Sequence, residues 1–198
     1  VNELVSKHLN QFPQRDREGM ESGVVPPVLV DSSFASAKTI LVDMPGSEQT
    51  SIRILSRAYR DQSSKSVPAD LAGIVMGGTF TSRLNAKLRE EKGYTYGAGC
   101  GFVGGYYGNH LSVRTNVQTP STAEAIEDLR MVLGTANEGF SADDHSKALS
   151  AYRADYVQMS ASRKQLAAEM VDLFRLGDKP TLWSSDLTIS QETTLEQM

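Results

Sequence analysis

The stretch that decides the fold is residues 77–97, GGTFTSRLNAKLREEKGYTYG. It opens with the pair Gly77-Gly78, which ends the helix that apolar spacing predicts over 68–76. A short, highly charged helix follows. In this helix Arg89 stands four residues before Gly93 and seven before Tyr96. The stretch is therefore expected to form one compact unit that carries an arginine and a tyrosine.

The composition of the 198-residue chain is that of a globular protein, with 39% hydrophobic and 22% charged residues. The net charge of −4 gives no basic excess that would indicate nucleic-acid binding. No apolar run approaches the roughly 18 residues that a membrane-spanning helix needs. The single cysteine, Cys100, excludes an internal disulfide and a cysteine-based zinc site.

Both ends of the sequence resemble cut elements. Residues 1–12 have helical spacing but no capping residue before them, and residues 193–196 have the form of a capping box with no helix after it. We therefore expect a fragment of a longer chain, although a frayed natural terminus stays an alternative. In this interpretation residues 1–28 are the end of a helix plus a linker, and residues 29–198 form one domain.

Strands are predicted first and helices afterwards. Apolar and β-branched runs predict strands over 37–44, 50–58, 95–102 and 106–117, with turns at Pro45-Gly46 and Gly104-Gly105. Helical spacing predicts helices over 68–76, 121–136, 141–156 and 162–176, and residues 121–124 have the form of a capping box. This order predicts an α+β fold, a two-layer sandwich whose largely antiparallel sheet has helices packed on one face.

The sequence contains no metal motif. His8, His110 and His145 are scattered, and none lies in an H-x-x-E-H or H-E-x-x-H pattern. A catalytic zinc needs about three protein ligands, so no metal site is expected in this chain. The glycines between 97 and 108 lack a G-x-G-x-x-G leading into a helix, and indicate a strand that another backbone approaches closely.

Residues 77–97 resemble the signature of the second half of the pitrilysin/insulysin-type zinc peptidases, the inverzincins, which include mitochondrial processing peptidase and many bacterial zinc proteases. In that family the first half carries the metal, and the second half supplies an Arg/Tyr pair that contacts substrate. The resemblance extends over roughly residues 40–176 and implies that this chain is the metal-free C-terminal half. By position it marks Arg89 and Tyr96 as the pair. The flanking motif residues are Gly78, Phe80, Ser82, Arg83, Leu84 and Gly93.

The implied role of the pair is substrate binding and transition-state support. Peptide hydrolysis develops negative charge on the scissile carbonyl oxygen, which Arg89 with five donors and Tyr96 with one O–H can stabilise. A purely structural interpretation stays open, in which Arg89 pairs with a neighbouring glutamate and Tyr96 packs at the core edge. Tyr94 competes with Tyr96, because it offers the same chemistry two residues earlier.

The resemblance implies the substrate-contacting half of a zinc metalloendopeptidase, inactive without a half that bears H-x-x-E-H. Zinc is then expected in the partner half, which is fused to this chain or is a separate subunit, and an acidic-to-neutral chamber holds the peptide. The alternative is a catalytically inactive peptide-binding or scaffold subunit of the same family. Cleavage specificity stays open. So does the compartment, because bacterial relatives occur in both cytoplasm and periplasm.

Overall fold

A computed structural model describes residues 38–57, 67–103, 110–176 and 182–198. The chain divides into two compact units, Val1–Ile40 and Leu41–Met198, and all the elements below belong to the second. The helix and linker predicted over residues 1–28, the domain boundary after them and the turn at Gly104-Gly105 lie outside the described residues.

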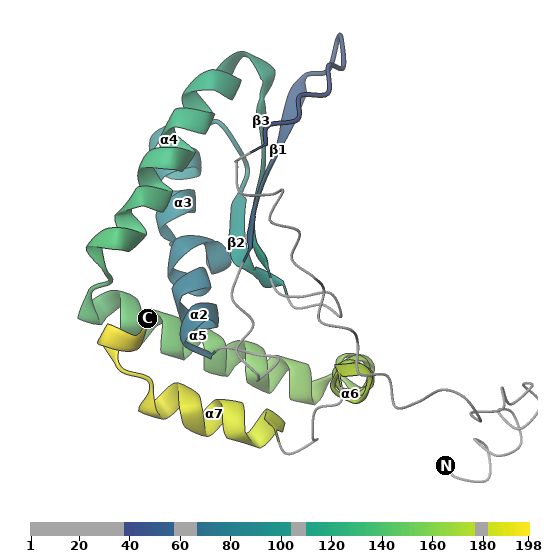
Figure 1. The fold of residues 1–198 in the computed structure, drawn as a ribbon, viewed down its shortest axis with the longest axis vertical. Coiled ribbons are helices and arrows are strands. Elements are labelled where there is room, and N and C mark those ends of the chain that lie inside the picture. The colour runs from purple at the N-terminus through teal and green to yellow at the C-terminus, as the bar shows by residue number, and fades with distance from the viewer. Residues whose placement is uncertain (1–37, 58–66, 104–109, 177–181) are drawn as a thin grey trace, which may run out of the picture. The chain divides into compact units, whose positions relative to one another are not determined.

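Three strands form an antiparallel sheet in the order β1-β3-β2 (Figure 1). They are β1 (Gln49–Arg57), β2 (Ala98–Val103) and β3 (His110–Gln118). β3 alternates as predicted, because Val113, Thr115 and Val117 are buried while Arg114 and Asn116 are exposed on the other face. The sheet therefore has a covered face and an open face.

The predicted strand over residues 37–44 is wrong for its described part. Residues 38–44 have no regular structure, and the side chains of Ile40, Leu41, Val42 and Met44 are exposed. The turn after them is formed, because Gly46 has a φ of 81° and Ser47 N–H donates to the Met44 carbonyl at 3.1 Å. A strand depends on a neighbour for its hydrogen bonds and side-chain cover. β1 pairs with β3 but not with this segment.

The covered face of the sheet packs against three helical segments (Figure 1). α2 (Val67–Gly73) continues into a π-helical turn, η2 (Ile74–Gly78), and α3 (Arg83–Asn85) continues into a second, η3 (Ala86–Glu91). α4 (Thr122–Gly134) lies between two 3-10 turns, η4 (Thr119–Ser121) and η5 (Thr135–Glu138). Leu84, Leu88 and Leu129 meet Val113 and Val117 in the core. The α+β prediction with helices on one face is confirmed.

The remaining helices pack beyond α2. They are α5 (Ala142–Ala161), α6 (Arg163–Leu176), α7 (Leu182–Glu192) and the short 3-10 turn η6 (Leu195–Gln197). A second core joins α2 to α5 through Leu71, Val75 and Ala148. The sequence did not predict α7. None of the helices in the described residues is long and apolar enough to cross a membrane.

Both predicted capping boxes are corrected. Ser121 makes no capping hydrogen bond, because η4 precedes α4 and Thr122 Oγ1 donates to the Thr119 carbonyl at 2.7 Å. At the C-terminus the capping residue is Thr194, with Gln197 as its partner, one residue later than the pattern indicated. Ser141, by contrast, begins α5 as predicted and forms a true capping box with Asp144.

Candidate functional site

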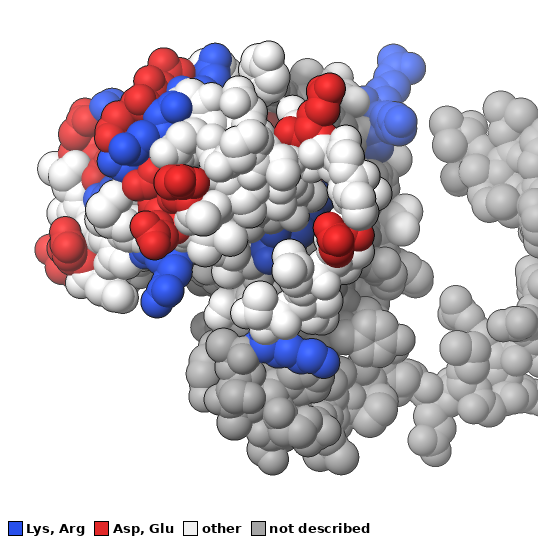
Figure 2. Space-filling model, turned by 90° about the horizontal axis from the view of Figure 1, so that it is seen from above, with Lys and Arg blue, Asp and Glu red and all other residues white. Residues whose placement is uncertain are grey.

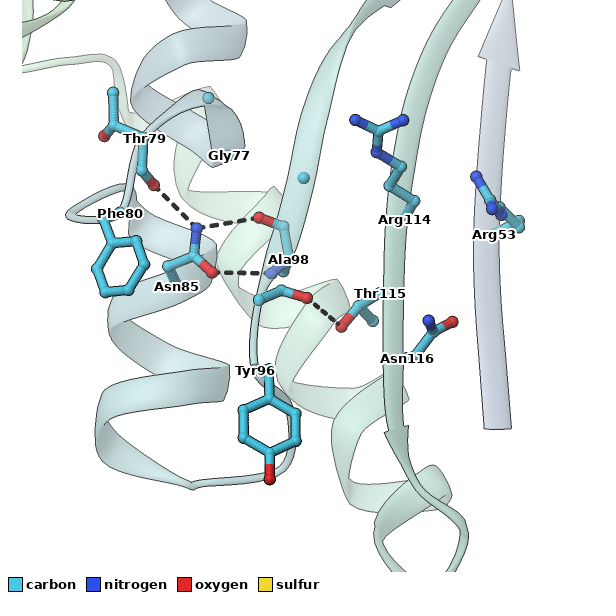
Figure 3. Close-up of a pocket in the computed structure, with 13 residues that line it drawn as sticks. Arg53, Gly77, Thr79, Phe80, Asn85, Tyr96, Ala98, Arg114, Thr115 and Asn116 are labelled. Atoms are coloured by element: carbon cyan, nitrogen blue, oxygen red, sulfur yellow. Dashed lines mark hydrogen bonds between the residues drawn. The ribbon is translucent and has the colours of Figure 1, made fainter. Parts of the chain in front are cut away.

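A pocket of about 470 Å³ lies where the motif loop meets the sheet (Figure 3). The motif supplies Phe80 and Tyr96 to its wall, and the open face of the sheet supplies Arg53 and Arg114. In Figure 3 the two arginines stand on neighbouring strands, β1 and β3, and the Tyr96 ring extends away from them. The pocket thus combines aromatic surface from the motif with positive charge from the sheet.

Asn85 fixes the motif loop to the edge of β2. Its side-chain oxygen accepts from Ala98 N–H at 2.8 Å, and its Nδ2 donates to the Ala98 carbonyl at 3.0 Å. The same Nδ2 donates to the Thr79 carbonyl at 2.8 Å and lies 3.1 Å from Ser82 Oγ. The amide therefore takes the place of a neighbouring strand at Ala98, while it holds the loop that carries Phe80.

Gly77 lets the helical layer touch β2 directly. A Cβ atom at this position would overlap the backbone nitrogen of Cys100 and lie 2.5 Å from Cys100 Cβ. This contact confirms the predicted close approach of another backbone to the glycine-rich strand. Burial also raises the pKa of the Cys100 thiol to about 11, so the sulfur stays protonated near neutral pH and is a poor nucleophile.

Arg89 sits on the π-helical turn η3, a backbone form that is frequent at functional sites. Its guanidinium lies over the Phe80 ring, 3.5 Å from the ring centroid, in a cation–π contact. Its Nη1 is 3.3 Å from Glu90 Oε1, as the structural interpretation expected, yet this buried nitrogen makes no hydrogen bond. Arg89 does not line the pocket itself. Phe80 does, and its ring contacts the Arg89 guanidinium.

The two candidate tyrosines differ in exposure. Tyr94 is half-buried and packs against the core, and its backbone bonds to Leu88 and Gln118. Tyr96 is 91% exposed and lines the pocket. Only the Tyr96 hydroxyl therefore combines a place at the pocket with free access to a ligand. Of the predicted pair, Tyr96 reaches the pocket directly and Arg89 only through Phe80.

Most of the flanking motif residues are structural. Ser82 and Leu84 are buried, Gly93 has a φ of 67° that favours glycine, and Gly78 lies close to Ile74. Phe80 is the exception, because it is 66% exposed and supports Arg89.

Arg83 joins the motif to the start of α5. Its Nη1 donates to the carbonyl and hydroxyl oxygens of Thr135 at 3.1 and 3.0 Å. Its Nη2 donates to the Gly139 carbonyl at 3.1 Å and to Asp144 Oδ2 at 2.9 Å. Burial would raise the pKa of Asp144, but hydrogen bonds from Ser141 and the Arg83 guanidinium outweigh it, so the pKa is lowered.

Asn85, Arg53 and Arg114 line the pocket but were not among the residues predicted from the sequence. An asparagine inside a predicted helix is a poor helix former, which was a readable signal for Asn85. For the arginines the signal was the absence of any Asp or Glu from the sequences of β1, β2 and β3. The expected acidic-to-neutral lining does not hold for this pocket, because its charged residues are Arg53 and Arg114.

Comparison with known proteins decides the family. Residues 1–152 match the sequence model of the peptidase M16 inactive domain. The chain belongs to this family. The match covers the whole 77–97 motif and ends within α5, so α6 and α7 lie beyond it. No curated protein is similar enough to be matched by sequence.

Three solved structures with the same fold come from bacteria. An M16 inactive domain from Pseudomonas fluorescens is 20% identical with a TM-score of 0.67, over 76% of this chain and 36% of that chain. A predicted zinc protease from Bordetella pertussis is 18% identical with a TM-score of 0.63, over 75% and 83%. The periplasmic protease PqqL from Escherichia coli is 15% identical with a TM-score of 0.59, over 77% and 17%. The chain thus spans about a third of the Pseudomonas fluorescens structure.

This M16 inactive domain does not offer a zinc site in its described residues, where no group of three or more His, Cys, Asp or Glu side chains converges. His110 lies on β3, and the half-buried His145 has its Nε2 2.8 Å from the Thr193 carbonyl. Because these residues do not fit a metal, no catalytic step is assigned to a metal within this part of the chain.

Proposed function

We propose that this M16 inactive domain is the substrate-contacting half of a zinc metalloendopeptidase. The observation that carries the proposal is the arrangement of Arg89, Phe80 and Tyr96 beside one pocket. The Arg89 guanidinium lies over the Phe80 ring, and Tyr96 is 91% exposed. Both groups are donors that a peptide carbonyl can use.

The proposed chemistry is stabilisation of developing charge. When water attacks a peptide bond, negative charge grows on the carbonyl oxygen, and fixed donors that meet this charge lower the barrier. Arg89 is cationic at any working pH, and Tyr96 adds a directional O–H. Zinc in a partner half that bears H-x-x-E-H supplies Lewis-acid chemistry and the activated water. That half is fused to this chain or is a separate subunit.

A second candidate is a catalytically inactive subunit that binds peptides or acts as a scaffold. It is favoured by the structural roles of most motif residues, because Ser82 and Leu84 are buried and Gly93 has a positive φ. In this case Arg89 and Tyr96 hold an extended peptide without hydrolysis. Peptide binding without cleavage by the complete native assembly, purified with no zinc-bearing partner, would favour this candidate.

The test is the turnover of the assembled peptidase with Arg89→Ala or Tyr96→Phe. We expect kcat/KM to fall by about 10-fold to 1,000-fold, the scale of a lost oxyanion donor. Tyr94→Phe is the matched control, because it removes the same hydroxyl from the half-buried competitor two residues away, and it should keep near wild-type turnover. If both test variants also turn over at the wild-type rate, the proposed role of the pair is wrong.

A further inference from the structure

Two arginines face each other on the open side of the sheet. The antiparallel register places Arg53 of β1 directly opposite Arg114 of β3, so both side chains leave the same face. Both residues are exposed, and both line the 470 Å³ pocket (Figure 3). Like charges at directly opposed positions destabilise a sheet. The stability of the fold therefore does not explain why two arginines stand at these positions.

Neither arginine has a charged partner in the described part of the chain. Within the described residues no ion pair or hydrogen bond involves Arg53 or Arg114. The three strands contain the arginines 53, 57 and 114 and no Asp or Glu, although the whole chain has a net charge of −4. Arg83 and Arg89 differ in this respect, because Arg83 binds Asp144 and Arg89 lies beside Glu90. The exposed helical arginines 130, 153 and 163 also have no ion pair among the described residues, but they do not face a second arginine across a pocket. The pair is therefore an uncompensated positive site in an acidic protein.

Gly99 of β2 lines the site beside Arg114. Gly99 pairs with Arg114 in the register, and a Cβ atom there would lie 3.1 Å from Arg114 Nε, so the missing side chain makes room for the guanidinium arm. At Gly101, outside the pocket lining, a Cβ atom would meet nothing within 4 Å, so the neighbouring part of β2 is open. An extended chain has space to lie across the strands at this point.

We infer that Arg53 and Arg114 together bind carboxylate side chains of an acidic polypeptide segment. This inference rests on the proposed function, because it names the class of substrate that the same pocket selects. Guanidinium groups match carboxylates with paired, charge-assisted hydrogen bonds. An extended peptide presents alternate side chains on one side, about 6–7 Å apart, a spacing that suits two arginines on neighbouring strands.

The charge around the site favours a peptide over a nucleic acid. Nucleic-acid surfaces carry a long basic stripe that follows the phosphates. Here the basic site consists of two side chains, and Figure 2 shows acidic and basic residues intermixed over the face that it displays. A short acidic segment needs only a local positive site.

The experiment measures binding of fluorescent decapeptides to the full natural chain by anisotropy. A chelator in the buffer prevents cleavage. The probes are alternating Ala-Glu, Ala-Gln and Ala-Lys peptides and a ten-residue oligothymidylate. We expect the Ala-Glu peptide to bind at least about tenfold more tightly than the Ala-Gln peptide, and 0.5 M salt to reduce this difference.

The variants are Arg53→Gln and Arg114→Gln, with Arg130→Gln as the matched control. Arg130 is an exposed arginine of α4, outside the pocket, and its loss removes the same charge. Each pocket variant should reduce binding of the Ala-Glu peptide about tenfold, whereas the control should not change it. The Tm of the pocket variants should not fall, because each removes one of two facing like charges.

Several outcomes overturn the inference. It is wrong if the Glu and Gln peptides bind equally, if the pocket variants keep the preference for the Glu peptide, or if the oligothymidylate binds as tightly and loses binding in the same variants. The proposed function is tested separately by the turnover of Arg89 and Tyr96 variants. Suppose that the Arg89 and Tyr96 variants lose turnover while the Arg53 and Arg114 variants still prefer the Glu peptide. That result contradicts this inference but not the proposed function.

Discussion

β2 is contacted differently on its two sides. On the covered side Gly77 touches the backbone at Cys100, and at the adjoining edge of the strand Asn85 binds both polar backbone groups of Ala98. On the open side Gly99 and Gly101 leave space, and Arg114 lies over Gly99 without a charged partner among the described residues. Polar groups on the covered side are thus satisfied within the protein, whereas those on the open side are available to a ligand. The same glycine-rich strand serves stability on one side and recognition on the other.

The largest difference in stability is expected between two variants that each add one methyl group, one to each side of β2. Gly77→Ala forces overlap with backbone atoms that have no room to move, so we expect the free energy of unfolding to fall by about 3 kcal/mol or more. Gly101→Ala meets open space and should change stability by less than about 0.5 kcal/mol. Urea unfolding of both variants measures the difference. Equal stabilities would mean that the close contact at Gly77 is not what holds the helical layer.

A smaller difference in stability is expected between two variants that each remove one side-chain amide, Asn85→Ala and Asn116→Ala. Asn85→Ala leaves the buried Ala98 N–H and carbonyl without partners, so we expect a loss of about 2–4 kcal/mol. Asn116→Ala removes the same amide from an exposed position on β3 and should cost under about 0.5 kcal/mol. Thermal unfolding monitored by circular dichroism gives both values. A large loss in the Asn116 variant would contradict the description of the open side.

The smallest effect concerns the ion pair that holds the motif to α5. The folded-state pKa of Asp144 is lowered, so its contribution to stability is present above its unfolded pKa of about 3.9 and is lost as pH falls through the folded value. We expect about 1 kcal/mol less stabilisation by Arg83 at pH 3 than at pH 7. Urea unfolding of wild type and Arg83→Gln at both pH values measures this.

The matched control for that experiment is Lys147→Gln, which removes an exposed partner of Asp143 on the same helix. Its stability relative to wild type should be nearly constant between the two pH values, because both members of that pair are more than 60% exposed and are screened by solvent. If Lys147→Gln shows a pH dependence as large as that of Arg83→Gln, the Arg83–Asp144 pair does not stabilise the protein more than an exposed ion pair does.

Much of the fold could be predicted because local periodicity and tertiary burial agree. The alternation of β3 and the apolar stripe of α4 each match the face that the core covers. The prediction was wrong over residues 38–44, where a strand-like composition lacks a partner strand, and at Ser121, where a 3-10 turn displaced the cap. α7 was not predicted, and its contacts to α2 and α5 join residues that are distant in sequence.

The sequence by itself determined the family, the order of elements and the motif that carries Arg89 and Tyr96, because these depend on residue identity and spacing along the chain. Only the tertiary structure decided that Tyr96 is open and Tyr94 is not, that Asn85 substitutes for a strand at Ala98, and that Arg53 stands opposite Arg114. The physical reason is register. Residues 61 positions apart become neighbours only when two strands pair, and no local pattern specifies which residues then face each other.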